Sequence, residues 1–70
     1  MKLKVGDKVT MNFPGHALHG QPFEVVKVNG RHQFVIARVL ERFGDYRAGE
    51  DLHLAGTLLA ALEPLEKGAV

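Results

Sequence analysis

Residues 2–13 alternate between apolar and polar side chains, the pattern of a strand with one buried face. Val9, Met11 and Phe13 fall on the apolar side. Pro14-Gly15 then ends this strand, because proline cannot donate to a strand ladder and glycine marks turns. The sequence therefore predicts a first strand and, after it, a loop that extends to Gln21.

Residues 22–42 contain two apolar runs, PFEVVKV and RHQFVIARVLER, joined by Asn29-Gly30. This dipeptide between apolar runs is a strong hairpin signal, and a two-residue turn would fix the register. Val28 would then lie opposite Arg31, and Phe23 opposite Ile36. The predicted core face consists of four residues, namely Phe23, Val25, Phe34 and Ile36.

The other face of this hairpin mixes polar residues with three valines, Val26, Val28 and Val35. It is too apolar for ordinary exposure and too polar for an interior, which indicates a half-covered sheet face. We predict that these three valines form an interface with a partner chain or a ligand.

The sequence of the C-terminal third predicts short strands, turns and a single helical turn. Phe43-Gly44-Asp45 and residues 48–51 are turn signals, and residues 52–54 alternate as a short strand. Pro64 prevents a long helix, so we expect one helical or 3₁₀ turn at residues 58–61 and a closing strand at 62–65. Residues 67–70 are expected to be frayed.

This layout resembles the SH3-like small barrels from roughly Val5 to Leu65. The resemblance rests on V-G-D-K-V near the start, the central hairpin, and L-L-A-A-L-E-P-L near the end. It implies an all-β, SH3-like five-stranded small barrel with a one-turn 3₁₀ helix before the last strand, as a single domain over residues 1–70 with its core at about 5–65. Other all-β arrangements, or a small α+β fold with a C-terminal helix, remain open.

Length and composition limit the function. A chain of 70 residues allows one domain, for which a single core gives roughly 3–5 kcal/mol of net stability. The absence of cysteine excludes disulfides and thiolate zinc sites, so a homo-oligomer stays open as a source of stability. The net charge of +1 provides no general attraction to nucleic acid or anionic lipid.

Nothing in the sequence favours a membrane or a secreted location. The longest apolar runs, such as Leu58 to Leu62, are far shorter than the ~20 residues that span a bilayer. The N-terminal MKLKVGDKV lacks the continuous apolar region of a secretory signal. We therefore expect a cytoplasmic protein of bacterial type with no membrane partner.

Catalysis has little support. With neither serine nor cysteine, Ser-His-Asp and Cys-His nucleophiles are excluded, and no glycine motif for phosphates occurs. His16 and His19 are close in sequence, but no third ligand follows from their spacing, so loop packing is the favoured interpretation. We predict no catalytic residues, no metal and no cofactor.

Local basicity near an aromatic is the best binding signal. The candidate set is Lys27, Arg31, His32, Arg38, Arg42, Tyr46 and Arg47. Small barrels that bind single-stranded nucleic acid combine a basic groove with stacking rings. Glu41, Asp45, Glu50 and Asp51 interleave with these cations, which favours an ordinary solvated face with scattered ion pairs.

The chain also looks similar to plasmid-encoded type II dihydrofolate reductase in G-D-K-V and A-A-L-E. That resemblance would imply a homotetramer whose shared pore binds substrate and a nicotinamide cofactor. The chain departs from the family at residues 52–55, where L-H-L-A stands in place of V-Q-I-Y.

Three functions follow from these observations. The favoured one is a non-enzymatic binding module that contacts a protein or nucleic acid, with the partner class left open. The alternatives are a self-associating structural protein, of the kind found in phages or mobile elements, and an oligomeric small-barrel enzyme.

Overall fold

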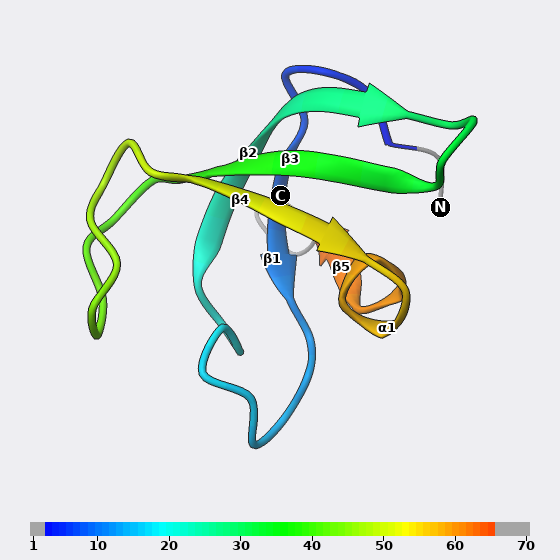
Figure 1. The fold of residues 1–70 in the computed structure, drawn as a ribbon. Coiled ribbons are helices and arrows are strands. Elements are labelled where there is room, and N and C mark those ends of the chain that lie inside the picture. Colours follow the sequence, from blue (N-terminus) through cyan, green and yellow to red (C-terminus); the bar gives the residue numbers. More distant parts are fainter. Residues whose placement is uncertain (1–2, 66–70) are drawn as a thin grey trace.

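The computed structural model describes residues 3–65 of the chain as five strands and one short helix (Figure 1). In chain order the elements are β1 (Lys8–Met11), β2 (Pro22–Asn29), β3 (Phe34–Val39), β4 (Asp51–Ala55), α1 (Thr57–Ala60) and β5 (Leu62–Pro64). The predicted first strand is confirmed over residues 8–11 only, and the loop after β1 and the fourth strand are confirmed as well.

The five strands form one antiparallel sheet in the order β4-β3-β2-β1-β5. The all-β class is therefore confirmed. β4 and β5 are the two edges of this sheet, and α1 packs against β4. Because the sheet is open between these edges, the closed barrel stays a prediction.

The β2–β3 turn is longer than the sequence predicted. Asn29 pairs with Phe34 and Val28 with Val35, so the turn contains residues 30–33. Asn29 Oδ1 accepts a hydrogen bond of 2.9 Å from the His32 N–H, which stabilises this wider turn. Within this turn, Gln33 has a positive φ of 57°, whereas Gly30 does not have a positive φ. The predicted two-residue turn and its register are wrong.

A β-bulge between Val25 and Lys27 changes which side chains face the core. Val25 pairs with Ala37 and Lys27 with Ile36, which leaves Val26 as the extra residue. On β3 the buried residues are consequently Val35, Ala37 and Val39. The prediction that Phe34 and Ile36 belong to the core face is wrong, because both are half-buried on the outer side of β3.

The core lies on the inner face of the sheet. Phe23 and Val25 are fully enclosed there, and Leu18 reaches the same core from the loop after β1. The other buried members are Val9, Met11, Val35, Ala37, Val39, Leu54 and Leu62. The alternation in β1 and β4 is thus confirmed as an inward-facing apolar pattern.

The C-terminal elements agree with the sequence except in helix type. Residues 57–60 form one α-helical turn, with N–H groups of Ala60 and Ala61 donating to the carbonyls of Gly56 and Thr57, each at 3.1 Å. The predicted single helical turn and the closing strand are therefore confirmed, whereas the 3₁₀ form that the barrel resemblance implied is wrong. No helix within residues 3–65 has the length and apolar character needed to cross a bilayer. The predicted fraying of residues 67–70 lies outside the described residues.

Candidate functional site: the outer face of β2–β4

The outer face of β2, β3 and β4 carries aromatic, apolar and charged side chains together. Phe34, Ile36 and Arg38 alternate with the buried residues of β3 and therefore project outward. The pairing places Lys27 and His53 on either side of Ile36. This surface is defined here as the outer face.

Phe34 and His53 form a stacked ring pair on the outer face. Their ring centroids are 4.3 Å apart and their planes differ by 29°. His53 is exposed and Phe34 is half-buried. A ring pair that is open to solvent on a sheet offers a further planar group a surface on which to stack.

Sequence reasoning missed this pair, because it assigned Phe34 to the core face of the hairpin. The alternation of β3 contained the signal. Counting Val35, Ala37 and Val39 as the inward positions would have turned Phe34 outward, toward His53.

A row of four charged side chains begins on β1 and continues across the three strands of the outer face. In the strand register Lys8 lies opposite Glu24, Glu24 opposite Arg38, and Arg38 opposite Asp51, so positive and negative charges alternate along the row. Arg38 Nε donates a hydrogen bond of 3.0 Å to Asp51 Oδ1. This bond and the negative charge of Asp51 raise the pKa of Arg38 above its ordinary value. Arg38 is therefore committed to cross-strand pairing within the sheet.

The predicted cations near the hairpin turn behave differently from Arg38. Lys27, Arg31 and His32 are exposed. In residues 3–65, Lys27 and Arg31 have no carboxylate partner within ion-pair distance. These two positive charges are available to an anionic ligand close to the Phe34–His53 pair.

Arg42, Tyr46 and Arg47 lie at the opposite end of the sheet, in the connection between β3 and β4 (Figure 1). The length of β3 separates them from the turn by roughly 17 Å. The ring of Tyr46 is 5.1 Å from that of Phe43, which meets the buried Phe23 edge-on at 6.1 Å. Tyr46 thus anchors its loop to the core. The predicted basic set is split into two separate regions.

The three valines predicted as an interface occupy three different environments. Val35 is 2% exposed and belongs to the core, so its predicted position on the partly covered face is wrong. Val26 is half-buried at the bulge, and Val28 is 40% exposed. Only Val26 and Val28 remain available for an interface.

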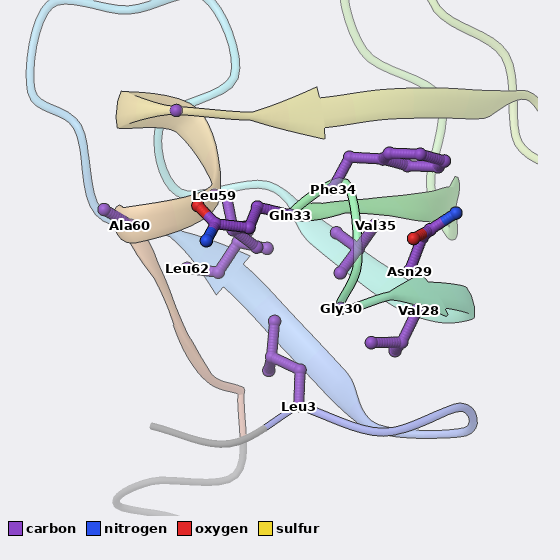
Figure 2. A pocket seen from close by; sticks show the side chains of 11 residues that line it. Leu3, Val28, Asn29, Gly30, Gln33, Phe34, Val35, Leu59, Ala60 and Leu62 are labelled. Atoms are coloured by element: carbon purple, nitrogen blue, oxygen red, sulfur yellow. The ribbon is translucent and has the colours of Figure 1, made fainter.

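Val28 lines an open groove between the hairpin turn and α1, with a volume of about 600 Å³ (Figure 2). Most of its lining is apolar. The residues around it are Leu3, Val28, Asn29, Gly30, Gln33, Phe34, Val35, Gly56, Leu59, Ala60 and Leu62.

The two histidines of the loop after β1 stabilise that loop. The Nδ1 atom of His16 accepts a hydrogen bond of 3.1 Å from the Leu18 N–H, and that of His19 accepts one of 3.0 Å from the Phe13 N–H. These bonds support the loop-packing interpretation. Residues 3–65 contain no group of three or more histidine, aspartate or glutamate side chains arranged to hold a metal ion.

Comparison with protein-family models, with curated proteins and with solved structures gives no match. The features that bear on function are therefore the two surfaces of the molecule, namely the outer face and the groove.

Proposed function

We propose that this protein is a non-enzymatic binding module whose outer face and adjoining hairpin turn contact single-stranded nucleic acid. The observation that carries the proposal is the stacked Phe34–His53 pair on a solvent-facing sheet. A base can stack on such rings whatever its identity, and each stacked base contributes about 1–3 kcal/mol.

The charges beside the ring pair are suited to phosphates. Lys27 lies across Ile36 from His53, and Arg31 lies in the turn that precedes Phe34. A strand whose bases stack on Phe34 and His53 would bring its backbone close to these two cations. Phosphate contacts contribute affinity, whereas stacking is largely independent of sequence.

We further propose that the sheet curves into an SH3-like small barrel. Support comes from the five antiparallel strands and from the single helical turn between the two edge strands, β4 and β5. Such barrels commonly place binding residues on one strand face and the neighbouring loops. The expected cytoplasmic location belongs to the same proposal.

Fluorescence anisotropy with labelled oligo(dT) and oligo(rU) at several salt concentrations tests this function. If Lys27 and Arg31 neutralise about two phosphates, the logarithm of the association constant should fall against the logarithm of salt with a slope of roughly −1.4. His53→Ala should weaken binding about fivefold or more, because it removes one ring of the pair.

Lys27→Ala and Arg42→Ala provide a matched comparison, since each removes one positive charge from an exposed side chain. Lys27→Ala should weaken binding and lower the salt slope, whereas Arg42→Ala should leave both unchanged. Equal losses from the two variants would contradict the proposed location, and no binding at low salt would contradict the function.

A self-associating structural role is the second candidate, and the exposed Val28 beside the open groove favours it. Sedimentation velocity over a range of protein concentrations tests it, with Val28→Asp as the variant that should dissociate an oligomer. A monomer at all concentrations would contradict this role. It would also count against the enzyme alternative, which needs a site shared between subunits.

A further inference from the structure

The groove between the hairpin turn and α1 contains no charged side chain among its lining residues. Its walls come from three separate parts of the chain, the N-terminal segment, the β2–β3 hairpin and the α1–β5 segment. The apolar side chains that form them are Leu3, Val28, Phe34, Val35, Leu59, Ala60 and Leu62. An ion would lose its hydration there without gaining an opposite charge, so the lining selects against ions.

Two carboxamides supply the polar side-chain groups of this lining. The Oδ1 atom of Asn29 is already used, because it accepts the hydrogen bond from the His32 N–H. The carboxamide of Gln33 has no hydrogen-bond partner among residues 3–65. In Figure 2 the Gln33 side chain points from the turn toward Leu59 and Ala60, across the groove.

The backbone of Gln33 is unusual for this position. Its φ of 57° lies in the left-handed region, and Gln33 is the one residue other than glycine with positive φ in the described chain. Glycine takes this conformation without steric cost, whereas a residue with a Cβ atom does not. Strained backbone of this kind is often kept where the side chain has a use.

We propose that the groove binds an uncharged, mainly apolar small molecule that carries one amide or hydroxyl group, which Gln33 recognises. The groove volume of about 600 Å³ lies within the range of small-molecule sites, which combine apolar walls with a few polar groups. The Gln33 carboxamide can both donate to and accept from such a group. This site shares Phe34 and the hairpin turn with the proposed nucleic-acid contact, but small-molecule binding does not depend on nucleic-acid binding.

Benzamide is a suitable probe, because it combines an apolar ring with one uncharged amide. Titration followed by ¹H–¹⁵N correlation NMR should shift the amide resonances of Val28, Gln33, Val35 and Leu59. Benzoate has the same shape but carries a charge, and it should bind at least tenfold more weakly. Shifts spread over the whole surface, or equal binding of benzoate, would overturn the proposal.

Gln33→Gly separates recognition from stability. It removes the carboxamide and also the left-handed strain, so the melting temperature should be unchanged or higher while benzamide binds about fivefold more weakly, the effect of one hydrogen bond. Gln33→Asn keeps a carboxamide and tolerates the same backbone, so it should recover part of the affinity. Unchanged affinity in Gln33→Gly would overturn the role of Gln33.

The alternative occupant of the groove is a second copy of the chain. In that case the same resonances would shift with protein concentration in the absence of benzamide, which would overturn the small-molecule proposal. Val28→Asp places a charge in the apolar wall at an exposed position and should abolish benzamide binding without unfolding the protein. Retained binding in this variant would place the probe elsewhere.

Discussion

In the loop after β1, two histidine side chains accept hydrogen bonds from backbone N–H groups, as carbonyl groups do within the sheet. The loop is not part of the sheet ladder, yet its backbone N–H groups need partners. His16 and His19 provide acceptors for Leu18 and Phe13 through their Nδ1 atoms. In both rings the proton must therefore lie on Nε2, which identifies the tautomer present in the folded loop.

Replacement of one of these histidines should destabilise the protein measurably. His19→Ala removes the acceptor of the Phe13 N–H, and we expect a loss of only about 0.5–1 kcal/mol in the free energy of unfolding, since this bond is exposed to water. Urea denaturation measures the loss. His32→Ala is the control, because only the backbone N–H of His32 makes a hydrogen bond in the turn. Equal effects of the two variants would contradict a specific role for the His19 ring.

At the scale of elements, the hairpin shows what the sequence could and could not predict. The existence of β2 and β3 followed from two apolar runs around Asn29-Gly30, but the same dipeptide suggested a turn that is too short. The preference of Asn29-Gly30 for a two-residue turn competes with the packing of the core, and here the packing determines the length of the turn. The wider turn and the bulge at Val26 bring Val35, Ala37 and Val39 inward, where Val35 pairs with Leu54 of β4.

The error in register also determined which part of the candidate site was found. Charged residues could be selected from the sequence by type, so Lys27 and Arg31 were among the predicted binding residues, and the structure shows both side chains exposed. The ring pair depends on long-range pairing between β3 and β4, which single-sequence patterns do not contain. The groove likewise needs Leu3, the hairpin and α1 to meet in space.

Gly30 offers a direct test of the turn. In a two-residue type I′ turn Gly30 would need positive φ, and an alanine there would be strained. In the four-residue turn Gly30 does not have positive φ, and a Cβ atom would meet no atom within 4 Å. Gly30→Ala should therefore be neutral or stabilise the protein by about 0.5 kcal/mol.

Gly56→Ala is the comparison for Gly30→Ala. Gly56 has φ of 60° and equally open surroundings, so an added Cβ atom would be penalised through the backbone alone. We expect a loss of about 1 kcal/mol in the free energy of unfolding, measured by thermal or urea denaturation. A similar loss in Gly30→Ala would favour the shorter turn.

At the scale of the whole molecule, the core is small, and each of the five strands contributes to it. Ten buried apolar residues make up the core of the described chain, and they come from all five strands and from the loop after β1. Leu18 is that loop residue, and it is 3% exposed. The loop is thus a structural part of the fold, although it lies outside the sheet.

Leu18→Ala should bring the protein close to unfolding at room temperature. Large-to-small substitutions at buried leucines cost about 2–5 kcal/mol, whereas a domain of this size has roughly 3–5 kcal/mol in total. Val5→Ala is the control, because Val5 is 64% exposed and its truncation should change stability by less than about 0.5 kcal/mol. Circular dichroism during urea titration measures both variants. If Leu18→Ala unfolded no more readily than Val5→Ala, the loop would pack on the core only loosely, and stability would have to come from another source such as self-association.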